Sequence, residues 1–228
     1  MKLFLVNFKN YSEGLGKSGV RILHTMEKVA KEYPEVRFIA SPSLIFLRSM
    51  VKKAKRVKIY AQHVDPVQLG SFTGHIPPEV VHTIGADGTL VNHSEKRMDL
   101  EKIKEAITLS QEQGLTVCAC APTPEIAGKI AEEGPNYLAY EPPELIGTDT
   151  SVSEAKPQLL LESVRSIKKR SDGKVLPLCG AGIKKALDVK KGLELGVEGI
   201  LIASGIVKAE NPYKKLKELA EPMVEFKS

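Results

Sequence analysis

Short runs of apolar residues alternate with longer amphipathic stretches from one end of the chain to the other. The apolar runs are about five residues long and seldom interrupted, which is typical of strands buried on both faces. The longer stretches repeat an apolar residue every three to four positions, which is the period of a helix with one buried side. The pattern therefore predicts a succession of strand–helix units.

Apolar runs predict strands at residues 3–6, 36–40, 57–61, 88–91, 115–120, 137–140, 175–179 and 199–202. The amphipathic stretches predict helices at residues 20–33, 44–51, from near Pro77, and at 100–113, 125–133, 157–169, 184–195 and 213–226. Gly114, Gly134 and Gly196 follow three of these helices, where a left-handed residue ends a helix.

Eight strand–helix units follow one another without a linker or a change in composition. This arrangement predicts a single domain over residues 1–228, folded as a closed parallel (β/α)₈ barrel of eight strands. The alternative from the pattern alone is an open doubly wound sheet. In a barrel, functional residues lie where strands end and the following loops begin.

Composition and charge exclude several classes of protein. The 228 residues carry 33 basic and 28 acidic side chains, a net charge of +5. The densest basic stretch, residues 52–56, lacks interleaved aromatic residues, so we interpret it as a solvated helix end and expect no nucleic-acid partner. The apolar start of the chain is too short for a secretory signal, and no run could span a membrane. We therefore expect a cytoplasmic protein with no membrane partner.

The chain has three cysteines, Cys118, Cys120 and Cys179, which cannot all pair within one chain. All three lie in apolar, strand-like segments, which favours buried thiols in a reducing compartment. The Cys-x-Cys pair has no second pair at zinc-ligand spacing, so we expect core residues and no metal site.

Chemically distinctive residues follow the predicted strands. Lys9 comes after the first, His93 after the fourth and Glu141 after the sixth. Small-residue turns follow the last two strands, at residues 180–182 and 203–205. One lysine, one histidine and one carboxylate at the carboxyl ends of three strands, with small-residue turns after two others, predict a pocket that binds an anion and moves a proton.

Here the sequence resembles the triosephosphate isomerase family over nearly its whole length. Asn7-Phe8-Lys9 is similar to the family's opening Asn-x-Lys, and residues 93–97 to its His-Ser-Glu-x-Arg. Tyr140-Glu141-Pro142 with residues 146–148 resembles the family's catalytic glutamate and hinged lid. The short chain is most similar to the compact archaeal branch. The implied activity interconverts dihydroxyacetone phosphate and glyceraldehyde 3-phosphate, in glycolysis and gluconeogenesis, without metal or cofactor.

The resemblance assigns the catalytic roles. Glu141 is expected to move the proton between two carbons, and Lys9 to stabilise the developing oxyanion. His93 is expected to stay neutral and donate a hydrogen bond. This family is a standard worked example of such tuning, with the histidine kept neutral by a helix amino terminus. By resemblance, Ser94 and Glu95 would begin that helix, and Glu95 would orient the site.

For the substrate, the resemblance implies a floor shaped by Asn7, which would also orient Lys9, and a phosphate held by backbone amides. The lid would run from Pro142 to Thr148 and exclude water. The expected substrate-binding residues are Asn7, Lys9, Ile146, Gly147, Gly182, Ala203 and Ser204.

The loop from Gln62 to His75 resembles the family's intersubunit loop, with Phe72-Thr73-Gly74 at its tip. The resemblance implies a homodimer in which Thr73 reaches the partner's site, and tetramers built from such dimers, as in the archaeal branch. His75 and Lys96 depart from the glutamate and arginine usual in the family, so this interface differs in its polar pairs.

Departures also occur on the phosphate side. Ala203 and Ser204 stand where the family usually has two glycines, and Gly182 replaces a common serine. None of these changes affects Lys9, His93 or Glu141. The other histidines, at positions 24, 63, 75 and 82, lack convergent partners in the sequence and are expected at the surface or an interface.

Three alternatives remain from the sequence. Residues 14–18 resemble the end of a nucleotide phosphate loop, but Tyr11 stands where its first glycine would be. A pentose-phosphate epimerase would need metal ligands from several strands, which the sequence does not offer. A non-catalytic phosphate-binding barrel would need no base, so the set of Lys9, His93 and Glu141 argues against it.

Overall fold

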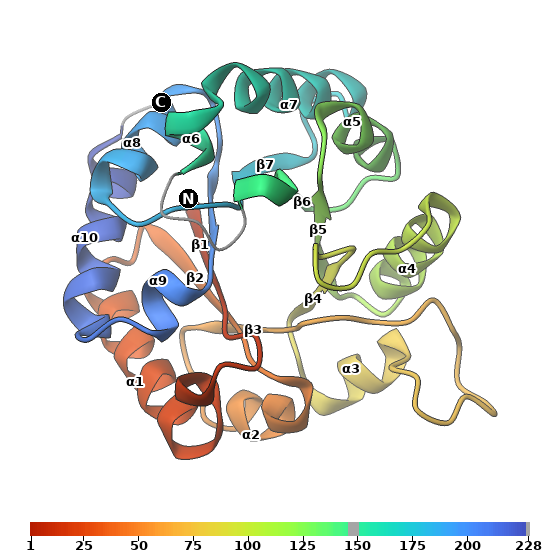
Figure 1. The fold of residues 1–228 in the computed structure, drawn as a ribbon. Helices are drawn as coiled ribbons and strands as arrows, with labels where there is room; N and C mark the ends of the chain where they lie inside the picture. The colour runs from red at the N-terminus through yellow and green to blue at the C-terminus, as the bar shows by residue number, and fades with distance from the viewer. Residues whose placement is uncertain (146–150, 227–228) are drawn as a thin grey trace.

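The computed structural model describes residues 1–145 and 151–226. Its strands form one closed parallel barrel, in which each strand pairs with the next and β8 pairs with β1 (Figure 1). The predicted (β/α)₈ barrel is confirmed, and the open-sheet alternative is wrong. The strands are β1 (Lys2–Asn7), β2 (Val36–Ser41), β3 (Lys58–Ala61), β4 (Gly88–Val91), β5 (Thr116–Ala121), β6 (Tyr137–Tyr140), β7 (Leu176–Cys179) and β8 (Gly199–Ile202).

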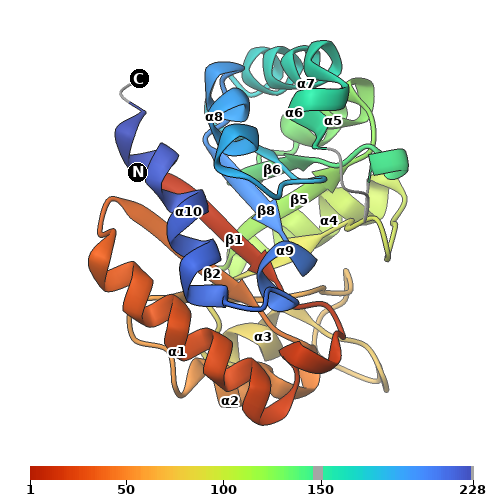
Figure 2. The ribbon, with the colours of Figure 1, turned by 60° about the vertical axis from the view of Figure 1, so that its left-hand side comes forward.

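Helices surround the barrel, and the views in Figures 1 and 2 show α1 and α10 side by side on one flank. The longer helices are α1 (Gly16–Glu32), α4 (Leu100–Glu112), α5 (Pro124–Glu132), α7 (Pro157–Arg170), α8 (Ala186–Glu194) and α10 (Pro212–Glu225). The shorter helices are α2 (Leu47–Val51), α3 (Pro78–Ile84), α6 (Val152–Ala155) and α9 (Ser204–Val207), with 3₁₀ turns η1 (Ser12–Gly14), η2 (Leu44–Phe46) and η3 (Pro143–Leu145).

The core has two layers, because successive side chains of a strand point to opposite faces. Leu3 and Leu5 of β1 belong to a cluster that contains only strand residues and fills the inside of the barrel. Phe4 and Val6 belong to a larger cluster shared with the helices, which seals the barrel against its outer ring. Both faces of β1 are buried, and this explains its unbroken apolar sequence.

Helix boundaries differ from the prediction mainly where the sequence lacks a period. Helix α1 begins at Gly16 rather than residue 20, because residues 16–19 carry no large apolar side chain to mark the first turn. The predicted helix at residues 44–51 is a 3₁₀ turn followed by α2. Helices α6 and α9 were not predicted, since four residues are too few to show a helical repeat.

The segment between β3 and α3 contains neither helix nor strand and extends away from the barrel (Figure 1). Leu69 and Phe72 of this segment are 56% and 43% exposed. No described helix is both long and apolar enough to cross a membrane.

Candidate active site

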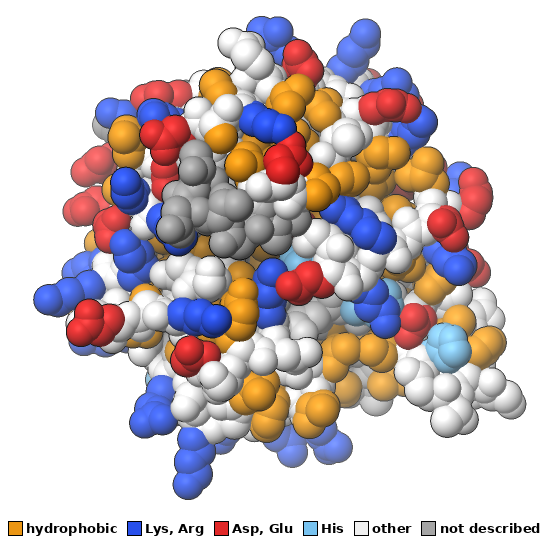
Figure 3. Space-filling model, in the orientation of Figure 1, with side chains coloured by type: hydrophobic (Ala, Val, Ile, Leu, Met, Phe, Trp, Pro, Cys, Tyr) orange, Lys and Arg blue, Asp and Glu red, His pale blue; other side chains and the backbone are white. Residues whose placement is uncertain are grey.

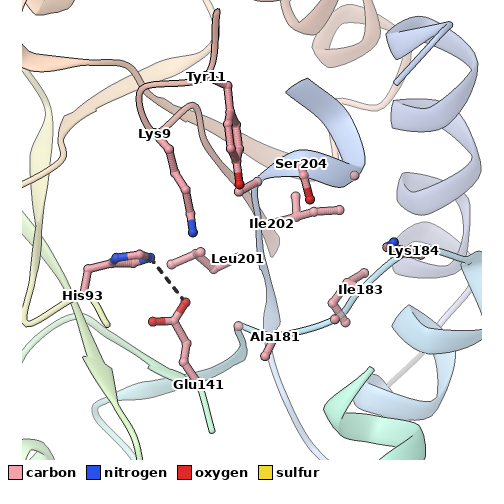
Figure 4. A pocket seen from close by; sticks show the side chains of 14 residues that line it. Lys9, Tyr11, His93, Glu141, Ala181, Ile183, Lys184, Leu201, Ile202 and Ser204 are labelled. Carbon is pink, nitrogen blue, oxygen red and sulfur yellow. Dashed lines mark ion pairs between the residues drawn. The ribbon is translucent and has the colours of Figure 1, made fainter. Parts of the chain in front are cut away.

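The strand ends meet around a cavity at the carboxyl-terminal mouth of the barrel. Lys9, His93 and Glu141 converge on it from the ends of three strands (Figure 4). Residues 180–184 after β7 and 201–205 around the end of β8 complete its wall. Figure 3 shows this face of the molecule, with basic, acidic and histidine side chains gathered near its centre. The barrel thus brings together the three residues for which the resemblance implies catalytic roles.

Glu141 follows β6 directly, and its backbone N–H donates to the carbonyl of Ala121 on β5 (2.9 Å). The residue is 2% exposed, and its Oε1 lies 3.8 Å from Nε2 of His93. Its Oε2 is buried and has no hydrogen-bond partner among the described residues. Such an unpaired carboxylate oxygen is costly to bury and is free to accept a proton from a bound molecule.

A glycine makes room for this carboxylate. A Cβ at Gly180 would lie 2.4 Å from Cγ of Glu141, far inside van der Waals contact. The backbone after β7 therefore packs directly against the Glu141 side chain and limits where its carboxylate can lie. This steric role was missed in the sequence, where Gly180 was only one small residue of a turn.

His93 follows β4 and is buried. Its Nδ1 accepts a hydrogen bond from the backbone N–H of Glu95 at 3.2 Å. Because an acceptor nitrogen carries no proton, this contact favours the tautomer with its proton on Nε2, the nitrogen that faces Glu141. The helix expected to begin at Ser94 and Glu95 is wrong: the segment is a turn, and a single turn amide performs the contact.

Asn92 shapes this turn. Its φ of 58° lies in the left-handed region, which asparagine adopts more readily than most residues. Its side chain donates to the carbonyl of Cys120 (2.8 Å) and accepts from the N–H of Met98 (2.9 Å). Asn92 therefore holds His93 against β5, a role that was not assigned from the sequence.

Lys9 also has a left-handed backbone, with φ of 47°. Its N–H donates to Oδ1 of Asn7 (2.9 Å), and its carbonyl accepts from Nε2 of Gln62 (3.0 Å). Its ammonium donates to Oε1 of Glu95 (2.9 Å), and its side chain is 13% exposed. A strained backbone held by several bonds is typical of functional positions. Gln62 was seen in the sequence only as the start of a loop.

The predicted phosphate residues differ in how far the structure describes them. Gly182 (φ 70°), Ala203 and Ser204 line the same cavity as Glu141. Ser204 begins α9, and the first amides of a helix have no acceptor within the helix. Ile146 and Gly147, together with Thr148 at the end of the expected lid, lie outside the described residues.

His63 differs from its expected environment. His63 is buried at 5% exposure, and its Nε2 donates to Oδ1 of Asp65 (3.0 Å). The expectation that it lacks a convergent partner is therefore wrong, because its partner lies only two residues away in a turn. Burial lowers the pKa of His63, and the Asp65 hydrogen bond opposes this shift.

The three cysteines are buried and unpaired, in β5 and β7. Burial raises the pKa of Cys179 to about 12, and burial together with the charge of Glu141 raises the pKa of Cys120. Thiols of this kind pack as apolar groups, as predicted. Within the described residues, no cluster of three or more His, Cys, Asp or Glu side chains is arranged to hold a metal ion.

Comparison with known proteins gives the family. A family model for triosephosphate isomerase matches residues 2–221. The triosephosphate isomerase of Methanocaldococcus jannaschii is 42% identical over 95% of this chain and 98% of its own. Those of Caldivirga maquilingensis and Archaeoglobus fulgidus are each 40% identical, over 97% and 96% of this chain and 97% of their own lengths. The chain therefore belongs to the triosephosphate isomerase family.

Proposed function

We propose that this chain interconverts dihydroxyacetone phosphate and glyceraldehyde 3-phosphate by proton transfer through an enediolate, in glycolysis and gluconeogenesis. One observation carries the mechanism: a buried carboxylate of Glu141 with an unpaired oxygen faces Nε2 of His93 at 3.8 Å, with Lys9 lining the same cavity. A binding site alone has no need of an unpaired buried carboxylate, which is costly.

Glu141 is the base. Its carboxylate takes a proton from C1 of dihydroxyacetone phosphate, and the C–H electron pair forms the C1–C2 double bond while the carbonyl electrons move to the C2 oxygen. The proton of the C1 hydroxyl passes to the C2 oxygen through Nε2 of His93, and the protonated carboxyl returns its proton to C2 as the C1 oxygen becomes the aldehyde carbonyl. The Glu141 side chain is buried, which keeps bulk water away from the carboxylate and supports this role.

His93 and Lys9 stabilise the enediolate. The Nε2–H of neutral His93 donates to the two substrate oxygens as charge develops on them, and the amide of Glu95 on Nδ1 supports that tautomer. The ammonium of Lys9 supplies a fixed positive charge. Its ion pair with Glu95 holds it at the cavity, and Asn7 fixes its backbone.

The phosphate binds at the other side of the cavity, to backbone amides at Gly182, Ala203 and Ser204, which line it together with Lys9. Ile146 and Gly147 complete the substrate site in this proposal. The segment from Pro142 to Thr148 closes over the intermediate and protects it from losing phosphate.

The chain also assembles through the loop from Gln62 to His75. A second hollow adjoins the first and is lined by ten residues: Asn7, Lys9, Asn10, Tyr11, Leu44, Gln62, His63, His93, Glu95 and Lys96. Ile45 beside it is 88% exposed, and Phe72 at the loop tip is 43% exposed. We infer that this hollow receives Thr73 of a partner chain in a two-fold dimer, and that such dimers pair into a tetramer.

We infer further that residues 1–228 fold as one domain, since the barrel uses strands from both ends of the chain. Unpaired buried thiols support a reducing compartment such as the cytoplasm.

A coupled assay tests the function. The purified protein is given glyceraldehyde 3-phosphate, and dihydroxyacetone phosphate is measured by its reduction, with and without a chelator. We expect rapid conversion that the chelator does not change. Loss of activity with the chelator would favour metal-dependent chemistry, as in the epimerase alternative. Phosphate-ester binding without conversion would indicate the non-catalytic alternative.

A further inference from the structure

Tyr11 is a residue of the candidate site to which neither the motifs nor the comparisons give a role. It follows the turn that carries Lys9 and lines the cavity together with Lys9, Gly182 and Ser204. Figure 4 shows its ring reaching into the cavity, with the hydroxyl on the same side as the ammonium of Lys9 and the hydroxyl of Ser204. Its polar end therefore lies beside the backbone assigned above to the phosphate.

The Tyr11 hydroxyl forms no hydrogen bond with any described residue, whereas the hydroxyls of Tyr213 and Tyr137 are paired. Tyr213 donates to Glu32 (2.8 Å), and the hydroxyl of Tyr137 accepts from Nη1 of Arg37 (3.1 Å). A phenol at the edge of a polar cavity that lacks a protein partner retains both a donor and an acceptor for a bound molecule.

The Tyr11 ring is held in place. The ammonium of Lys208 lies 4.2 Å from the ring centroid, within the range of a cation–π contact. Lys208 ends the helical turn that begins at Ser204, and its N–H donates to the carbonyl of Ser204 (3.0 Å). The carbonyl of Tyr11 accepts from the N–H of Gly14 (2.8 Å). One lysine therefore ties the tyrosine to the segment that presents Ala203 and Ser204.

We propose that Tyr11 donates its hydroxyl to a phosphate oxygen of the substrate, and that Lys208 is a positioning residue that holds the ring for this contact. The inference rests on the proposed function, since it names a further ligand for the same triose phosphate. A hydrogen bond to a charged oxygen is among the stronger kinds. It acts equally in the ground state and the transition state, because the phosphate takes no part in the proton transfer.

Tyr11→Phe keeps the ring and its lysine contact but removes the hydroxyl. We expect KM for glyceraldehyde 3-phosphate to rise about tenfold with kcat within about twofold, the pattern of a lost uniform binding contact. The dissociation constant of glycerol 3-phosphate, which has the phosphate but no carbonyl, should rise equally by calorimetry. Turnover of phosphate-free glyceraldehyde should not change.

Tyr33→Phe is the matched control, since Lys217 lies over the Tyr33 ring (5.9 Å to the centroid) and Tyr33 does not line the cavity. It should leave every value unchanged. Lys208→Gln should raise KM by about threefold in the wild type, and should have no further effect in the Tyr11→Phe background.

An unchanged dissociation constant for glycerol 3-phosphate in Tyr11→Phe would overturn the proposal. An equal effect of Lys208→Gln in both backgrounds would overturn the positioning role, because the lysine would then act by its own charge. Wild-type protein that binds glycerol 3-phosphate without converting glyceraldehyde 3-phosphate would count against the proposed function instead. The two failures are therefore distinguishable.

Discussion

The two sides of the barrel mouth are built by different means. On the side that we assign to proton transfer, Lys9, His93 and Glu141 each offer a charged or ionisable side chain, and hydrogen bonds hold the backbone of Lys9 and Glu141 and the ring of His93. On the side that we assign to the phosphate, Gly182 and Ala203 offer little beyond backbone. The function of the first side depends on the identity of its side chains, and that of the second side depends on the path of its backbone.

This difference explains how each side tolerates substitution. A backbone amide is present in every residue except proline, so Ala203 and Ser204 can replace the glycines usual in the family without removing a donor. No other residue type supplies a carboxylate of the right length at position 141, or an imidazole at position 93. We therefore expect changes on the proton-transfer side to lower kcat, and changes on the phosphate side to raise KM.

The largest effect is expected from Glu141→Gln. An amide cannot accept the carbon-bound proton, so kcat should fall by about three orders of magnitude or more, while the affinity for glycerol 3-phosphate stays close to wild type. Steady-state kinetics and calorimetry measure the two quantities. Glu125→Gln is the control, because Glu125 is an exposed carboxylate of α5 that pairs with Lys129 outside the cavity. Retention of more than about a tenth of the wild-type kcat would mean that another group is the base.

A smaller effect is expected from Gly180→Ala. The added methyl group would meet Cγ of Glu141 at 2.4 Å and displace the carboxylate. Misplacing a catalytic group by about an ångström costs roughly a hundredfold in kcat. Gly192→Ala is a matched control, since its Cβ would meet Val197 at 3.3 Å and would be distant from Glu141. If Gly180→Ala raised KM instead and left kcat intact, this turn would belong to the phosphate side.

Thr73→Arg tests whether assembly supports the proton-transfer side. A large charge at the loop tip should prevent the loop from docking next to Asn7 and Lys9 of a partner chain. The variant should form smaller species with intact helicity, and its kcat should fall by up to about tenfold. Sedimentation, circular dichroism and kinetics measure these effects. Thr108→Arg, at an exposed position of α4, should change none of them. A fully active monomer at micromolar concentration would contradict both the interface and its role in catalysis.

Much of the fold was predictable because the hydrophobic pattern reports burial directly. Strands β4, β6 and β8 have the predicted limits, since buried runs end where polar loops begin. The sequence did not predict α6 or α9, whose four residues are shorter than two helical turns. Their position depends on packing against the barrel, which local periodicity does not encode.

The candidate site divides in the same way. Lys9, His93 and Glu141 were predicted because their side-chain chemistry is unusual at a strand end. Gln62 and Gly180 were not, because they act through contacts with distant segments: Gln62 lies 53 positions from the Lys9 carbonyl to which it donates. The helix expected at Ser94 was carried over from relatives, and here one turn amide makes the contact with His93 instead.

The smallest effect concerns His63, which lies at the start of the loop from Gln62 to His75, next to the proton-transfer side. Burial lowers its pKa from the usual 6.5, so the folded protein resists protonating it while the unfolded chain does not. The unfolded state then binds more protons below about pH 6.5, and stability falls as the pH drops through this window. One such group changes the unfolding free energy by no more than about 1.4 kcal/mol per pH unit.

In thermal unfolding between pH 8 and 5, His63→Gln should show a shallower loss of stability than the wild type. His24→Gln, at an exposed position of α1, removes a histidine without touching the loop and should retain the wild-type slope. Equal slopes in all three proteins would show that His63 is not the group that makes the loop sensitive to acid.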